Sequence, residues 1–170
     1  RPPRRPWAIY SSVGSLTPVQ HLAVNLGAPG DRRDAHGTVW LTYPRPKPYR
    51  ETGLETKLNV DVKFVKTGGY EAANEDSTPI AGTETPWVFT SWARGLTECS
   101  IPLRGPNDGP AEYDVTLYFT DAAEGAATRK PFDVKVQGNA VFTNLDIAAE
   151  SGGTRRALTR KLDNDRVNDN

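Results

Sequence analysis

The chain has 170 residues, a length typical of one domain with a sizeable core. Its 21 basic and 21 acidic side chains balance, so no net field would draw it to nucleic acid or to an acidic membrane surface. No stretch is apolar enough to cross a bilayer, and a single cysteine, Cys99, excludes an intrachain disulfide.

The N-terminal end is rich in proline and arginine. Residues Arg1 to Pro6 cannot pair regularly in a sheet, so we expect residues 1–20 to form a linker and residues 21–170 the folded domain. The chain begins without a methionine and ends on the turn-like run DNDRVNDN. We therefore expect a processed piece of a larger protein.

Period-two alternation of apolar and polar residues recurs along the domain, which is the pattern of half-buried strands. It predicts about nine strands, at 22–26, 38–43, 58–64, two short ones on either side of 93–95, 113–119, 132–136, 141–147 and 157–162. Residues 68–86 are polar and turn-rich, which predicts a long loop, either functional or disordered. Gly138-Asn139 predicts a two-residue type II′ turn.

These strands, joined by long connections, favour an all-β fold, an antiparallel two-sheet β-sandwich, over an up-and-down barrel. Cys99 alternates with Ile101 and Leu103, so we expect it to be a small hydrophobe in a strand core.

Three stretches carry a resemblance to a known family: LAVNLGAPGDRRDAHGTVW, WVFTSWARGLTECSIPL running into YDVTLYF, and FDVKVQGNAVFTNLDIAAESGG. Together they resemble the malectin and malectin-like domains. The resemblance implies a jelly-roll β-sandwich of the galactose-binding-like folds. The phrase GAPGDRRDAHGTVWLTYP is also similar to modules at the end of large secreted bacterial multidomain proteins, which implies an extracytoplasmic location. Residues from about 44 to 83 are an insertion relative to malectin.

The family binds carbohydrate or serves as an extracellular recognition and packing module. By position, the resemblance implies that Asp146 is the sugar-binding aspartate and that Trp92 is one of the sugar-binding rings. The positions at which the family has paired aromatic residues are occupied in this chain by Ala123 and Glu124. The family's further apolar strand is missing, so we expect the domain to be a fragment that lacks its last strand.

Sugars stack their C–H faces on aromatic rings while carboxylates and amides bind their hydroxyls. Tyr43, Tyr49 and Tyr70 are rings of this kind. Trp92 precedes Ala93-Arg94-Gly95 at a predicted strand end, where binding and packing are both open. We expect Trp40 and Trp87 to be core residues instead. Asp146 either binds a hydroxyl or caps the neighbouring bend.

No cofactor is implied by any motif. Asp31, Asp34 and His36 are interrupted by Arg32 and Arg33, which favours a charge-paired turn over a metal site. DNDRVNDN has oxygen ligands at calcium-like spacing but lacks the glycine and glutamate of an EF-hand loop; a structural calcium site is the alternative left open there.

Catalysis has no clear motif, since His21 and His36 are the only histidines and neither lies beside a nucleophile. We predict a non-catalytic carbohydrate-binding module whose partners are a glycan or polysaccharide and the parent chain's other domains. The alternative is a structural domain that packs against its parent chain or another subunit. A glycosidase with an unrecognised carboxylate pair is a third hypothesis.

Overall fold

The structure is a computed structural model, and it describes residues 18–45, 60–122 and 131–167, with only the backbone described from residue 164 onward. Outside this range lie residues 1–17 of the linker expected at 1–20, Tyr49, residues 58 and 59 of the strand predicted at 58–64, and the positions Ala123 and Glu124. Among the described residues, no helix is both long enough and apolar enough to span a membrane.

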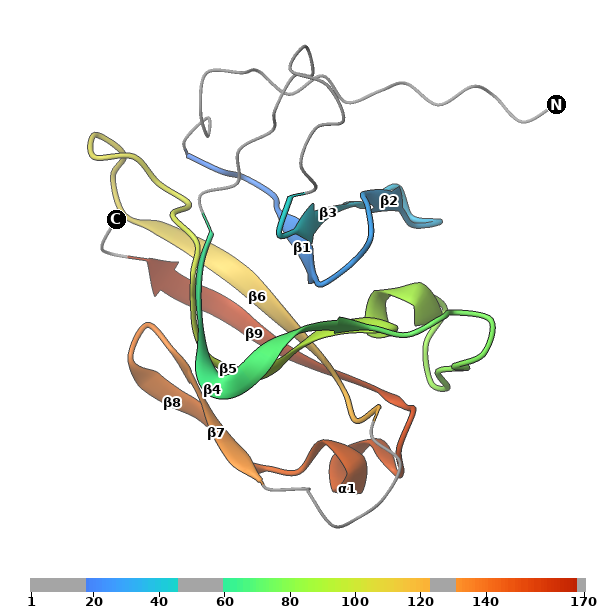
Figure 1. The fold of residues 1–170 in the computed structure, drawn as a ribbon. Coiled ribbons are helices and arrows are strands. Elements are labelled where there is room, and N and C mark those ends of the chain that lie inside the picture. Colours follow the sequence, from blue (N-terminus) through green and yellow to red (C-terminus); the bar gives the residue numbers. More distant parts are fainter. Residues whose placement is uncertain (1–17, 46–59, 123–130, 168–170) are drawn as a thin grey trace, which may run out of the picture.

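The described chain is mostly β (Figure 1). One 3₁₀ turn and one short α-helix interrupt the strands. In order, the elements are β1 (Ala23–Leu26), β2 (Arg32–Arg33), β3 (Val39–Tyr43), β4 (Asp61–Ala72), η1 (Pro86–Phe89), β5 (Ser91–Ser100), β6 (Ala111–Thr120), β7 (Phe132–Val136), β8 (Asn139–Leu145), α1 (Ile147–Ser151) and β9 (Ala157–Val167).

The strands pair in four small sheets. β3 lies between β1 and β2, while β4 pairs with β5, β6 with β9 and β7 with β8. Three of these sheets are antiparallel as expected, but β1 runs parallel to β3. The expectation of an entirely antiparallel fold is therefore wrong at β1. Parallel pairing arises because the chain crosses over through the 27–38 segment instead of turning back in a hairpin.

The alternation predicted most of the strands, and the differences have physical causes. The predicted loop at 68–86 begins later, because β4 extends to Ala72. Of the two short strands expected on either side of residues 93–95, the first falls partly on η1, and β5 runs from Ser91 to Ser100 without a break. The glycines that suggested breaks, at 68, 69 and 95, instead sit at a bulge between the two strands. The turn-like residues 163–167 continue β9 along β6, because a paired strand satisfies their backbone groups whatever their side chains prefer.

The hairpin of β7 and β8 turns one residue earlier than predicted. Val136 pairs with Asn139, so the two loop residues are Gln137 and Gly138, with φ of 52° and 79°. Positive φ at both positions is typical of a type I′ turn, not type II′. The expected alternation also stops early, because Ile147 begins α1 instead of extending the strand.

The core is centred on Trp40, Ile80, Val88 and Phe89, with Trp87 packed against its edge. Trp40 meets the ring of Trp87 edge-on at a centroid distance of 6.1 Å, a favourable arrangement for aromatic pairs. The prediction that Trp40 is a core residue is confirmed, whereas Trp87 is only half-buried.

Cys99 is exposed, so its expected place in a strand core is wrong. It lies near the end of β5, where the strand runs past the core and the last five residues are all exposed.

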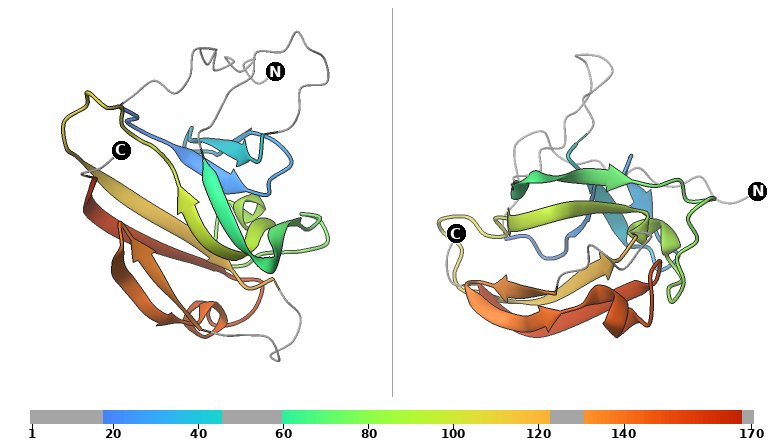
Figure 2. Two further views of the ribbon diagram at one scale, coloured as in Figure 1. Left: turned by 60° about the vertical axis from the view of Figure 1, so that its left-hand side comes forward. Right: turned by 60° about the horizontal axis from the view of Figure 1, so that its bottom comes forward.

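Two groups of strands lie on opposite sides of the molecule (Figure 2). In the right-hand view, β4 and β5 occupy one side, while β6 to β9 and α1 occupy the other. A buried hydrogen bond of 2.9 Å from Ser91 Oγ to Asn25 Oδ1 joins the start of β5 to β1.

Candidate functional site

Tyr43 and Tyr70, two of the residues proposed to stack on sugar, lie together. Tyr43 ends β3 and Tyr70 lies in β4, and their rings meet edge-on at 6.1 Å. Tyr70 also meets Phe64 edge-on at 5.0 Å. The Tyr43 hydroxyl donates a 2.7 Å hydrogen bond to the Val60 carbonyl. Burial raises the pKa of Tyr70, and the neighbouring Tyr43 adds to this.

Trp92 lies at the start of β5, directly across from Glu71 of β4. Its indole Nε1 donates a 3.1 Å hydrogen bond to Glu71 Oε2. Arg94, two residues further along β5, donates from Nε to Glu71 Oε1 at 2.5 Å. Side chains two apart in a strand share a face, so the indole, the carboxylate and the guanidinium line one face of the hairpin.

The backbone beneath this group is held by the chain that follows β1. Gly27 has a φ of 82°, and a Cβ there would lie 3.0 Å from the Glu71 carbonyl oxygen and 3.1 Å from that of Trp92. Only glycine allows so close an approach in this conformation. The base of the Trp92 group is therefore fixed against β1, while the side chains of Arg94 and Glu71 keep 57% and 38% of their surface exposed.

Asp146 caps the short helix α1. Its side chain accepts a 3.0 Å hydrogen bond from the backbone N–H of Ala149, as a good N-cap residue does. Of the two roles left open for this aspartate, capping is the one seen in the geometry. The helix lies on the side of the molecule opposite β4 and β5 (Figure 2).

The four predicted site residues thus fall into three places. Tyr43 and Tyr70 are together, Trp92 is on the adjacent strand beside Glu71, and Asp146 is on α1. Tyr70 and Glu71 are consecutive in β4, so their side chains point to opposite faces of the hairpin.

Sequence reasoning missed Glu71 and Arg94 as possible members of the group. The i, i+2 spacing of Trp92 and Arg94 was a usable signal for Arg94. Glu71 had no such signal, because its position opposite Trp92 depends on the register shifts between β4 and β5 at residues 63–69.

The acidic segment before β3 has paired charges, as predicted, but the partners lie elsewhere in the chain: Asp31 pairs with Arg45 and Arg32 with Glu75. Asp34 Oδ1 accepts backbone hydrogen bonds from His36 and Thr38, and Oδ2 accepts one from Trp40 Nε1 at 3.1 Å. The Trp40 hydrogen bond is the main cause that lowers the pKa of Asp34, and the two backbone donors add to it, against the opposing effect of burial.

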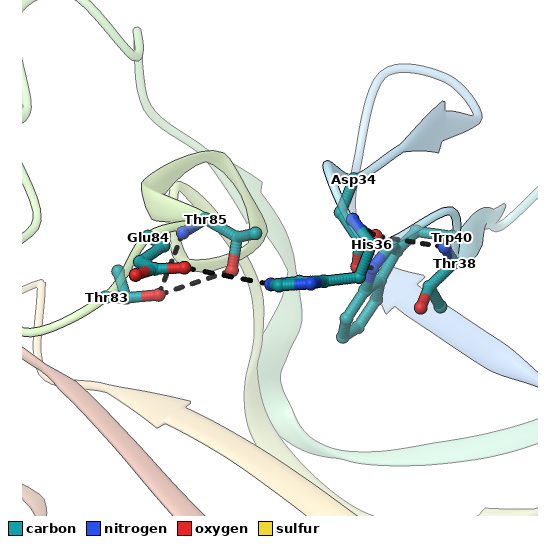
Figure 3. A network of polar contacts seen from close by, with 7 residues as sticks. All are labelled: Asp34, His36, Thr38, Trp40, Thr83, Glu84 and Thr85. Carbon is teal, nitrogen blue, oxygen red and sulfur yellow. Dashed lines mark hydrogen bonds and ion pairs between the residues drawn. The ribbon is translucent and has the colours of Figure 1, made fainter.

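His36 reaches from this loop toward Glu84 in the facing turn (Figure 3). Their side chains are 3.7 Å apart, and both are largely exposed, so the contact contributes little to stability. Nearby, Asp31 accepts from the backbone N–H of Thr42 at 2.8 Å and pairs with Arg45.

Within the described ranges, no three His, Cys, Asp or Glu side chains gather as a metal site would require. Asp163 and Asp165 of the calcium-like run belong to β9, and the other two candidate ligands, Asn168 and Asp169, lie outside the described residues. The register of β6 and β9 shifts between Asp165 and Leu162, but the backbone on both sides of the shift is paired, unlike the loop that wraps its oxygens around calcium.

The family described as Malectin domain matches residues 22–170. No curated protein and no solved structure matches the chain.

Proposed function

The chain belongs to the malectin domain family, a carbohydrate-binding family, and we propose that it is a non-catalytic carbohydrate-binding module of a larger extracytoplasmic protein. The family match covers nearly all of the domain expected at 21–170, and membership implies a β-sandwich. Display on a larger protein would offset the weak affinity of a single shallow site through multivalency.

The observation that carries the proposal is the group of Trp92, Glu71 and Arg94 on the β4–β5 hairpin. An aromatic ring beside a carboxylate and a guanidinium supplies both a stacking surface and hydrogen-bonding groups for sugar hydroxyls. The two hydrogen bonds to Glu71 hold these side chains in place before a ligand arrives, which lowers the entropic cost of binding. Tyr70, on the other face of β4, and Tyr43 of β3, whose ring meets it, form the second stacking surface in this proposal.

The proposal is tested by affinity electrophoresis of the 170-residue chain in gels that contain soluble polysaccharides. We expect at least one polysaccharide to retard the chain, and Trp92→Ala to abolish the retardation. Trp87→Ala is the matched control, because Trp87 is also half-buried but packs on the core cluster. Equal retardation of wild type and Trp92→Ala by every polysaccharide would contradict the assignment of Trp92.

Two variants of Asp146 are run in the same affinity gels. Asp146→Asn keeps an oxygen that can cap α1 but removes the charge, whereas Asp146→Ala removes both. If Asp146 binds a sugar hydroxyl, Asp146→Asn should weaken retardation while the variant stays as stable as wild type. Retardation by Asp146→Asn equal to wild type would leave Asp146 with its capping role alone.

A structural or protein-interaction domain is the second candidate. The observation in its favour is apolar surface near the bulge of the β4–β5 hairpin, where Val65 is 48% exposed and Leu96 38% exposed. If these side chains contact another subunit, light scattering should detect a species larger than the monomer, and Val65→Lys with Leu96→Lys should return it to the monomer. A monomer at every concentration, with glycan retardation, favours the binding module.

A further inference from the structure

Among the residues that the structure describes, only the Nε of the Arg94 guanidinium has a hydrogen-bond acceptor. Its Nε donates to Glu71, and no other described residue accepts from its two terminal nitrogens. The side chain is 57% exposed, so the edge with the two terminal nitrogens is open to solvent. A guanidinium edge presents parallel N–H donors in a fixed plane, and that geometry matches the two oxygens of a carboxylate.

Glu71 is already engaged on both oxygens. One accepts from Trp92 and the other from Arg94. Both Glu71 oxygens therefore hold neighbouring side chains, while the terminal nitrogens of Arg94 donate to no acceptor in the described part of the chain. A ligand that complements this face must supply acceptors beside the Trp92 ring.

We propose that the Trp92 group selects glycans that carry carboxylates, that is, uronic acid residues, with Arg94 as the residue that determines this specificity. The sugar ring stacks on Trp92 while its carboxylate accepts two hydrogen bonds from the terminal nitrogens of Arg94. Glu71 is a positioning residue, because it fixes the guanidinium through Nε and does not itself contact the carboxylate. This inference rests on the proposed carbohydrate-binding function.

The test compares acidic polysaccharides with their neutral forms. Polygalacturonate and alginate are each run in affinity gels beside the same polymer after chemical reduction of its carboxyl groups. We expect the wild-type chain to bind the acidic form at least about tenfold more tightly, since hydrogen bonds between ionised partners are about twice as strong as neutral ones. Chemical denaturation of each variant shows that it is folded.

Three variants separate a specific contact from simple charge. Arg94→Ala should remove the preference for the acidic form, and Arg94→Lys should lose most of it because an ammonium keeps the charge but not the planar fork. Lys63→Ala is the matched control. Lys63 lies on the same hairpin, is also more than half exposed and pairs with Glu98, so its removal should leave the preference unchanged.

The outcomes distinguish this inference from the function it rests on. Equal, Trp92-dependent binding of acidic and reduced polymers would overturn the inference and leave the proposed function standing. An equal loss in Lys63→Ala and Arg94→Ala would overturn it too, as nonspecific charge attraction. No binding to any acidic or neutral polysaccharide would overturn both.

Discussion

Asp34, Asp108, Asp133 and Asp146 all accept hydrogen bonds from backbone N–H groups at turns or element ends. In Asp34, Asp108 and Asp146 the short side chain reaches a backbone N–H two or three residues away, whereas Asp133 accepts across the hairpin from Asn144. At the residue scale, the main structural role of these aspartates is therefore to accept hydrogen bonds that fix the backbone conformation. That role competes with ligand binding for the same oxygens, and it explains why a sequence motif alone left two roles open for Asp146.

The cap of α1 can be measured directly. Asp146→Ala removes the acceptor for the Ala149 N–H, and we expect it to lower the free energy of unfolding by about 1 kcal/mol. Asp146→Asn should change it by no more than about 0.3 kcal/mol, because asparagine is an equally good N-cap residue. Urea denaturation monitored by circular dichroism gives both values. A similar loss in the two variants would show that the charge of Asp146, and not its hydrogen bond, stabilises the helix.

At the scale of elements, the β7–β8 hairpin shows how one turn sets the register of two strands. Placing the loop at Gln137 and Gly138 fixes Val136 opposite Asn139. The pairing of the two strands shifts in register between Phe132 and Lys135. In the same region Asn144 has a φ of 55°, and its N–H donates a hydrogen bond to Asp133. Bulges of this kind bend a hairpin and end its alternation, and here α1 follows almost at once.

Gly138→Ala tests the conformation of this turn. The glycine has a φ of 79°, and a Cβ there would meet nothing within 4 Å, so the cost is that of the backbone alone. We expect a loss of about 1–2 kcal/mol in the free energy of unfolding.

Gly30→Ala is the control for this substitution, because a Cβ at Gly30 also meets nothing and its φ is not positive. It should change stability by less than about 0.5 kcal/mol. Equal effects of the two substitutions, compared by thermal or urea unfolding, would rule out the type I′ assignment.

On the scale of the whole molecule, Trp40 connects elements that are far apart in the sequence. Its ring contacts Trp87 of η1 and Tyr118 of β6, and its Nε1 donates to Asp34 in the preceding loop. Buried aromatic rings contribute large contact areas, so a single tryptophan on β3 joins the N-terminal sheet to the strands on the other side of the molecule.

Trp40→Ala should therefore destabilise the entire domain. The residue is 7% exposed, and truncation of a buried tryptophan costs about 3–5 kcal/mol. Val65→Ala, at a side chain that is 48% exposed, should change stability by less than about 0.5 kcal/mol. Denaturant titration of both variants gives the comparison. A small effect of Trp40→Ala would mean that the core cluster does not link the sheets.

The sequence by itself determined the family resemblance and most of the strands. These depend on local properties, namely alternation with period two and turn residues. The resemblance also indicated Trp92 as a candidate ring, although the strand end predicted there is instead the start of β5. The sequence could not place Trp92 relative to Tyr70 and Asp146, because that depends on which strands pair.

Only the tertiary structure decided which side chains share a face. The register between β4 and β5 passes through a bulge, and a shift of one residue moves every side chain to the other face of the sheet. That register puts Glu71 opposite Trp92, and it separates both from Tyr70. The parallel pairing of β1 with β3 and the helical start at Ile147 were decided in the same way, since pairing and packing over long sequence distances outweigh local preference.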